Sequence, residues 1–210
     1  IKIDVKNKKI IFQNGLNLSY NNILSTLPLN VTVKLAEIEM DCKEDPYIAV
    51  LVLNIGAFKG PKCPEYHWLY IPRSHSGFHR IGFYSNVDSS FLPNSYRHKE
   101  NYVSIYVERS LQADKIFTDV ELSKYKESVV NELISWGFIE KPEIVDATFI
   151  PVAYTWTYPG SKWRDYAIKK LSESNIFQCG RFANWKNQGI ADSIFEGITQ
   201  GKSLRNELGK

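Results

Sequence analysis

The strongest constraint on the fold is a set of long β-forming runs in the middle of the chain. Four runs are dense in β-branched and aromatic residues and are separated by turn-forming loops: Tyr47–Phe58, His67–Ile71, Arg80–Ser85 and Tyr102–Arg109. A fifth run of the same kind covers Glu143–Tyr158. Consecutive strands joined by such loops tend to pair with one another, so these runs predict one largely antiparallel sheet.

Helices are predicted before, among and after these strands in the sequence. Thr118 and Glu121 have the spacing of a capping box, and Gly137 ends the helical pattern that follows them. Apolar residues recur there at helical spacing, at Leu122, Tyr125, Val129, Val130, Leu133 and Ile134. Other helices are predicted from Pro28 to about Ile38, over Lys162–Leu171, and over Asp192–Thr199 with Asp192 as N-cap. Short strands are predicted at Ile1–Val5, Lys9–Phe12 and Asn175–Cys179. The order of the predicted helices and strands along the chain indicates a mixed α+β fold.

Composition and charge exclude several classes of protein. Of the 210 residues, 43% are hydrophobic and 13% aromatic, which supports a packed core. The 26 basic and 23 acidic residues leave a net charge of +3, and no block of like charges marks a nucleic-acid groove. The longest apolar stretch, Ile48–Leu53, is far shorter than the roughly 20 residues that cross a membrane. We expect neither a nucleic-acid partner nor a membrane span.

Cysteine and histidine usage predicts no metal site. Cys42, Cys63 and Cys179 match neither a disulfide framework nor a metal-binding pattern, so we expect reduced packing residues in a cytoplasmic protein. The three histidines between positions 67 and 79 have no partnering cysteine pair and no recognised ligand spacing. No Gly-x-Ser-x-Gly turn is present, and we predict no catalytic residue in this chain.

The first candidate site lies in the second and third runs. On a strand, Trp68 and Tyr70 point to one face, where an indole and a phenol form a stacking platform for a flat ligand. If the intervening loop closes a hairpin, Arg80 returns on the neighbouring strand and can hold an anion with its planar fork of donors. The alternative is an aromatic sheet face covered by a helix, with Arg80 in a structural ion pair.

The second candidate site lies near the end of the chain. A strand that ends in Gly180 and Arg181 lets the backbone approach a ligand while the guanidinium reaches a phosphate. The helix that follows near Asp192 offers free N–H groups to an anion or an electron-rich ring edge. The alternative is an ordinary connecting loop with glycines at its turns. The chain contains no Gly-x-Gly-x-x-Gly, the usual dinucleotide-phosphate loop.

At these residues the sequence resembles the flavoprotein superfamily of UDP-galactopyranose mutases, protoporphyrinogen oxidases and amine oxidases, and within it the mutase-like branch. The resemblance is carried by Ile23–Leu29, Trp68–Pro72, Arg80–Phe83, Ser85–Asn86, Tyr158–Pro159, Gly180–Phe182 and Trp185. It implies that Tyr70, Arg80 and Tyr158 bind the diphosphate of a sugar nucleotide beside Trp68. It also implies FAD as cofactor, contacted by Gly180, Arg181 and the helix start at Asp192.

The resemblance further implies a domain plan and a partner. Residues 1–40 and 173–210 would belong to a Rossmann-like FAD-binding domain, and residues 41–172 would form the substrate domain. The chain does not start with Met, and we expect Ile1 to lie within a longer protein whose N-terminal half supplies the dinucleotide loop. The resemblance favours the C-terminal part of a flavin-dependent mutase that acts on a UDP-sugar. The alternatives are an FAD-dependent oxidoreductase of the amine oxidase or protoporphyrinogen oxidase type, and a non-catalytic sugar-nucleotide-binding module.

Overall fold

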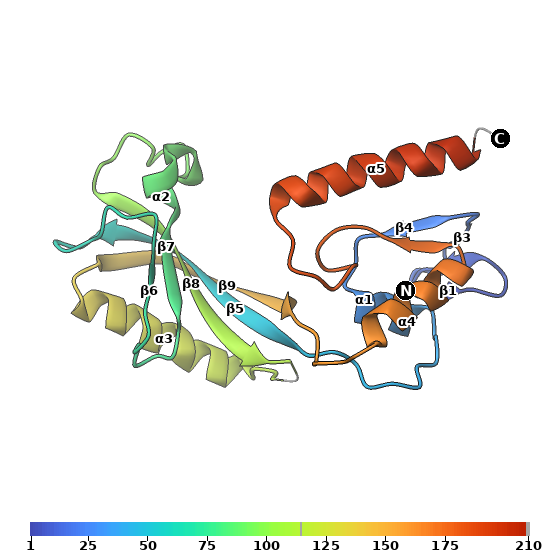
Figure 1. Cartoon of the computed structure of the whole chain (residues 1–210). Helices are drawn as coiled ribbons and strands as arrows, with labels where there is room; N and C mark the ends of the chain where they lie inside the picture. Colours follow the sequence, from blue (N-terminus) through green and yellow to red (C-terminus); the bar gives the residue numbers. More distant parts are fainter. Residues whose placement is uncertain (114, 209–210) are drawn as a thin grey trace. The chain divides into compact units, whose positions relative to one another are not determined.

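The computed structural model describes residues 1–113 and 115–208, which form two compact units (Figure 1). The central unit is one continuous segment, residues 48–153, and the terminal unit combines residues 1–47 with 154–208. These boundaries differ from those expected at 40/41 and 172/173, chiefly because residues 154–172 group with the terminal segments. The helix in that stretch, α4 (Trp163–Glu173), packs against β10 (Ile176–Gln178) and α1 (Leu29–Leu35).

The central unit is built on a five-stranded sheet in the order β6-β7-β8-β5-β9. Its strands are β5 (Tyr47–Lys59), β6 (Trp68–Tyr70), β7 (Arg80–Phe83), β8 (Tyr102–Gln112) and β9 (Ile139–Thr155). The pairings β6–β7, β7–β8 and β8–β5 are all antiparallel. The predicted mixed α+β fold with a largely antiparallel sheet is confirmed.

One face of this sheet is covered by α3 (Asp119–Ser135), which begins where the capping box predicts. Thr118 Oγ1 accepts from the Glu121 N–H at 3.2 Å, and the Glu121 carboxylate accepts from the Thr118 N–H at 2.9 Å. Gly137 takes φ +73° just past the helix, a conformation that favours glycine.

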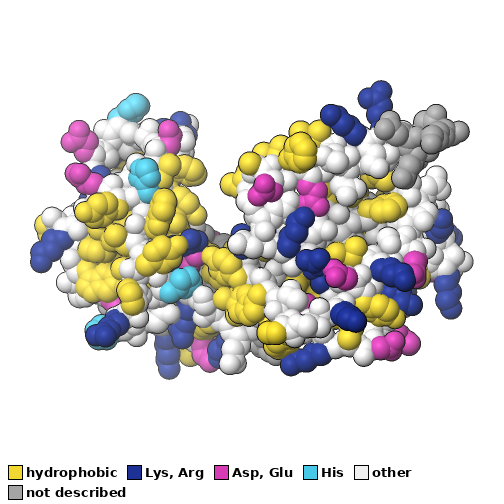
Figure 2. Space-filling model, viewed as in Figure 1, with side chains coloured by type: hydrophobic (Ala, Val, Ile, Leu, Met, Phe, Trp, Pro, Cys, Tyr) yellow, Lys and Arg dark blue, Asp and Glu magenta, His cyan; other side chains and the backbone are white. Residues whose placement is uncertain are grey.

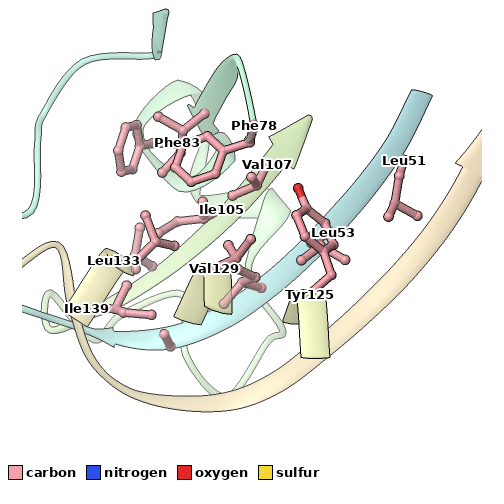
Figure 3. Close-up of a cluster of buried hydrophobic side chains, with 14 of the residues drawn as sticks. Leu51, Leu53, Phe78, Phe83, Ile105, Val107, Tyr125, Val129, Leu133 and Ile139 are labelled. Atoms are coloured by element: carbon pink, nitrogen blue, oxygen red, sulfur yellow. The ribbon is translucent and has the colours of Figure 1, made fainter. Parts of the chain in front are cut away.

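The hydrophobic core lies between α3 and the sheet, as Figure 3 shows. Val129 and Leu133 of the helix are fully buried against alternate strand residues such as Leu53, Ile105 and Val107. Full burial of each such side chain contributes about 1.5–3 kcal/mol, so this layer fixes which sheet face points away from the helix. The side chains at intervening strand positions are therefore directed to the opposite face.

The terminal unit contains a small parallel pairing between two distant segments. β4 (Ile23–Ser25) pairs with β10, with Leu24 opposite Phe177. A separate antiparallel sheet consists of β1 (Lys2–Asp4), β2 (Lys9–Ile11) and β3 (Asn17–Ser19), the last of which the sequence did not predict. Trp163 and Trp185 pack edge to face at 5.0 Å in the interior of this unit.

The last helix, α5, is longer than predicted and begins earlier. It runs over Ile190–Leu208, whereas the sequence pattern predicted Asp192–Thr199. The strand predicted over Arg80–Ser85 also ends early, because the chain turns into α2 (Tyr84–Val87) and a 3-10 turn, η1 (Ser89–Phe91). The three cysteines form no disulfide. Within the described residues, no helix has the length and apolar character needed to cross a membrane.

Candidate functional site

In the central unit, aromatic and charged residues share the sheet face opposite α3. The hairpin between β6 and β7 is formed as the sequence predicted, and its register places Tyr70 opposite Arg80 and Trp68 opposite Gly82. Leu69, between the two aromatic residues, packs against the core, whereas Trp68 and Tyr70 are 54% and 65% exposed. Figure 2 shows apolar side chains gathered on the surface over β6 and β7.

The next strand adds two residues that sequence reasoning missed. Tyr106 and Glu108 of β8 lie opposite Gly82 and Arg80. The Tyr106 ring occupies the space that a side chain at Gly82 would need, so the glycine permits this close approach. Tyr106 also packs on Tyr84, with ring centroids 4.5 Å apart, and Tyr84 stacks on Phe91 at 5.3 Å. The aromatic platform therefore extends beyond Trp68 and Tyr70 of β6 to Tyr106, Tyr84 and Phe91.

Arg80 is held by an ion pair on this face. Its Nη2 donates to Glu108 Oε1, and the Glu108 side chain is only 12% exposed. His79 Nε2 lies 3.9 Å from Glu108 Oε2. Burial lowers the pKa of His79, Glu108 opposes that effect, and Arg80 adds to it. The ion pair expected in the alternative reading is present, but Trp68 and Tyr70 are exposed rather than covered by a helix. The role of Arg80 in anion binding stays a prediction.

Tyr158 belongs to the terminal unit, so the four predicted substrate-binding residues are divided between the two units. Its backbone N–H donates to Asp45 Oδ1 at 3.1 Å, and Lys43 Nζ lies 4.6 Å from its ring centroid. Tyr158 is 40% exposed and is therefore accessible to a ligand. The predicted diphosphate contact of Tyr158 stays a prediction.

In the terminal unit, the loop after β10 is tied to α5 through one carboxylate. Glu196, whose side chain is 18% exposed, accepts from the Gly180 N–H at 3.2 Å, from Asn184 Nδ2 at 2.6 Å and from Gln188 Nε2 at 2.7 Å. Gly180 has φ +89° and nothing within 4 Å of the position a Cβ would take. The loop therefore leaves an open space directly beside its backbone.

Arg181 lies at the edge of that space, between two rings. Its guanidinium carbon is 5.5 Å from the Tyr154 centroid and 5.7 Å from the Phe182 centroid. Its Nε is buried and has no hydrogen-bond partner among the described residues. A hollow of about 530 Å³ adjoins it, lined by side chains of the loop and of the first turns of α5, including Cys179, Phe182, Ile190 and Ile194. The size of this hollow is within the range of small-molecule and cofactor sites.

Asp192 is not the N-cap of α5, contrary to the prediction. It lies in the first turn of the helix, and its Oδ2 accepts from the Gly189 N–H at 3.1 Å. The carboxylate therefore satisfies a donor just before the helix, as an acid at this position of a capping box does. Its predicted contact with a cofactor stays a prediction.

Comparisons with known proteins support the fold. Neither the protein-family models nor the curated proteins yielded a match. Among solved structures, a reduced UDP-galactopyranose mutase is 22% identical with a TM-score of 0.67, covering 89% of this chain and 41% of its own. A protein described as a protoporphyrinogen oxidase from Exiguobacterium sp. 255-15 is 10% identical with a TM-score of 0.65, covering 95% and 44%. An oxidoreductase from Methanosarcina mazei is 10% identical with a TM-score of 0.53, covering 92% and 48%.

The three matches also agree on how much of each protein is covered. The chain spans less than half the length of each of these three proteins. Nearly all of it is included in each match, so both compact units contribute to the likeness. The chain therefore shares its fold with part of a UDP-galactopyranose mutase and part of a protoporphyrinogen oxidase.

Proposed function

We propose that this chain is the C-terminal part of a cytoplasmic, FAD-dependent enzyme that acts on a sugar nucleotide in the manner of UDP-galactopyranose mutase. The observation that carries the proposal is the exposed sheet face with Trp68, Tyr70 and Arg80 on adjacent strands. Two exposed rings beside a guanidinium suit a ligand with a flat base and an anionic group. The likeness in fold to a UDP-galactopyranose mutase supports this choice of ligand.

The loop before α5 fits a flavin. Gly180 leaves space beside its backbone, and Arg181 has a buried Nε that needs an acceptor. We propose that Gly180 lets the ring system approach the backbone while Arg181 donates to it. Asp192 and the first turn of α5 would face the ring edge. When bound, FAD supplies a ring that can act as a nucleophile toward a sugar or as a hydride acceptor.

We further propose that an N-terminal half of the same protein completes this flavin site. The chain has no Gly-x-Gly-x-x-Gly of its own. Ile190, Ile194 and Ile198 follow one another at helical spacing on α5 and are 83%, 60% and 52% exposed. Among the described residues, the parallel sheet of β4 and β10 has two strands, and parallel strands are normally part of larger sheets covered on both faces. Both features support a partner segment that covers them.

A second candidate is an FAD-dependent oxidoreductase of the amine oxidase or protoporphyrinogen oxidase type. The ion pair between Arg80 and Glu108 favours it, because a compensated guanidinium leaves a face with little net charge. Such a face suits an uncharged aromatic substrate better than it suits a diphosphate. The fold likeness to a protoporphyrinogen oxidase is compatible with this candidate.

Calorimetric titration of UDP into the flavin-loaded full-length protein separates these candidates. Arg80→Ala should weaken UDP binding by about 2–5 kcal/mol, because it removes a charge-assisted contact and leaves Glu108 facing the ligand. Tyr70→Phe should cost on the order of 1 kcal/mol, the loss of one hydrogen bond. Arg73→Ala, at an exposed position in the loop between β6 and β7, is the matched control and should bind like the wild type. Absence of UDP binding to the wild type would reject the sugar-nucleotide proposal and favour the oxidoreductase.

A further inference from the structure

The carboxylate of Glu108 lies between two nitrogen donors of different kinds. Arg80 donates to Oε1, whereas Oε2 lies 3.9 Å from His79 Nε2. Oε2 is buried and has no hydrogen-bond partner among the described residues. An ionised carboxylate oxygen out of contact with water normally has a donor, so this oxygen is placed to receive one from the imidazole.

The second ring nitrogen of His79 also has a polar neighbour. Its Nδ1 lies 3.3 Å from Ser110 Oγ, and its side chain is 37% exposed, so solvent protons can reach the ring. A protonated imidazole donates from both ring nitrogens and can therefore serve Ser110 and Glu108 together. Burial and Arg80 lower the pKa of His79, whereas Glu108 raises it.

The two phenols that face this cluster do not change charge in the same pH range. Tyr84 and Tyr106 face Arg80 and Glu108, and burial raises the pKa of both phenols above the ordinary value of 10.0. Tyr70 lies close enough to Tyr106 to interact with it electrostatically. His67, next to Trp68 on the same hairpin, is the other imidazole near the platform and needs its own control.

We propose that His79 is a specificity-determining residue whose protonation strengthens the binding of a diphosphate ester on this sheet face. The inference rests on the proposed sugar-nucleotide function. With His79 neutral, the charges of Arg80 and Glu108 cancel. With His79 protonated, the same three side chains carry one net positive charge, which favours an anionic ligand over a neutral one.

The direction of the pH effect follows from linkage. A ligand that binds better to the protonated form must bind more tightly as the pH falls through the pKa of His79, and the bound ligand must raise that pKa. The site would then hold sugar nucleotides most firmly in mildly acidic conditions. A neutral aromatic ligand on the same face would show no such dependence.

The test is calorimetric titration of UDP-galactose into the full-length protein with oxidised flavin, from pH 5 to pH 8. Both diphosphate ester and oxidised flavin keep a constant charge over this range, so the slope reports on the protein. Wild-type affinity should rise about fivefold or more from pH 8 to pH 5. His79→Gln should bind with the wild type's pH 8 affinity throughout, and His79→Lys should bind at pH 8 as tightly as the wild type does at pH 5. His67→Gln and His75→Gln should keep the wild-type slope.

The outcomes separate this inference from the function on which it rests. If UDP-galactose binds but His79→Gln keeps the full slope, or either control loses it, the role of His79 is wrong and the sugar-nucleotide function stands. If UDP-galactose binds to no variant at any pH, the proposed function fails and the inference fails with it. Thermal unfolding of each variant confirms that the comparison is made between folded proteins.

Discussion

At the scale of single residues, the candidate site depends on how close two strands can bring their side chains. Gly82 has no side chain, and the Tyr106 ring fills the space above it. This contact sets Tyr106 beside Arg80, whose guanidinium carbon lies 5.8 Å from the ring centroid. Gly82 therefore influences both the shape of the platform and the surroundings of Arg80.

We predict that Gly82→Ala destabilises the central unit by about 1–3 kcal/mol, because the added methyl group overlaps the Tyr106 ring. Denaturant unfolding measures the loss. In a Tyr106→Ala background the obstacle is gone, so there the same substitution should cost little. Gly197→Ala, on α5 with nothing within 4 Å of the added atom, is the control and should be neutral or slightly stabilising. An equal cost of Gly82→Ala in both backgrounds would show that the overlap is not the cause.

At the scale of elements, α3 shows how a local signal sets the position of a whole helix. The pKa of Glu121 is lowered from 4.5 to about 2, chiefly by the hydrogen bond from the Thr118 N–H of the capping box and next by the Lys115 ammonium at 3.1 Å. The folded state therefore favours the ionised carboxylate. This contribution to stability is complete above pH 4.5 and disappears as the pH falls toward 2.

We predict that Thr118→Ala costs about 0.5–2 kcal/mol at neutral pH, the usual effect of removing an N-cap. Ser123→Ala, at an exposed position of the same helix, should leave stability unchanged or slightly raised. Unfolding of both variants in urea, followed by circular dichroism, gives the comparison. A Thr118→Ala variant as stable as the Ser123→Ala variant would contradict the assigned role of the cap.

The elements also show what the sequence could and could not predict. The hairpin of Trp68, Tyr70 and Arg80 was predictable because side chains alternate along a strand and consecutive strands tend to pair with each other. The position of Glu108 was not predictable, because its place opposite Arg80 depends on the register between β7 and β8. Asp192 was assigned as an N-cap because its residue type favours that position, but its carboxylate bonds back to Gly189 from inside the first turn. Local patterns predicted the elements, and long-range pairing decided which side chains meet.

At the scale of the whole molecule, the two units differ in how the chain builds them. The central unit is continuous in sequence and has its own core under α3. The terminal unit is assembled from both ends of the chain and exposes the apolar residues of α5. Residues 154–172 could not be assigned to it from sequence, because their place depends on the packing of α4 against β10 and α1.

We predict that the isolated chain folds but retains little FAD, and that an N-terminal segment with a dinucleotide-binding loop restores stoichiometric flavin when the two are produced together. Flavin absorbance after gel filtration measures retention. A yellow isolated chain with one flavin per molecule would show that no further segment is needed.

In the complete protein, Arg181→Ala should lower flavin affinity by about 1.5–3 kcal/mol, the loss of a charge-assisted hydrogen bond.

The parallel pairing of β4 with β10 has a consequence for synthesis on the ribosome. The two strands are separated by about 150 residues, and the central unit lies between them. At about 5–20 residues per second, β4 waits roughly 8–30 s before β10 is made. The central unit, continuous and with a core of its own, can fold during that interval. The exposed β4 edge is therefore the segment most in need of protection while the nascent chain grows, and the terminal unit closes only after β10 has been translated.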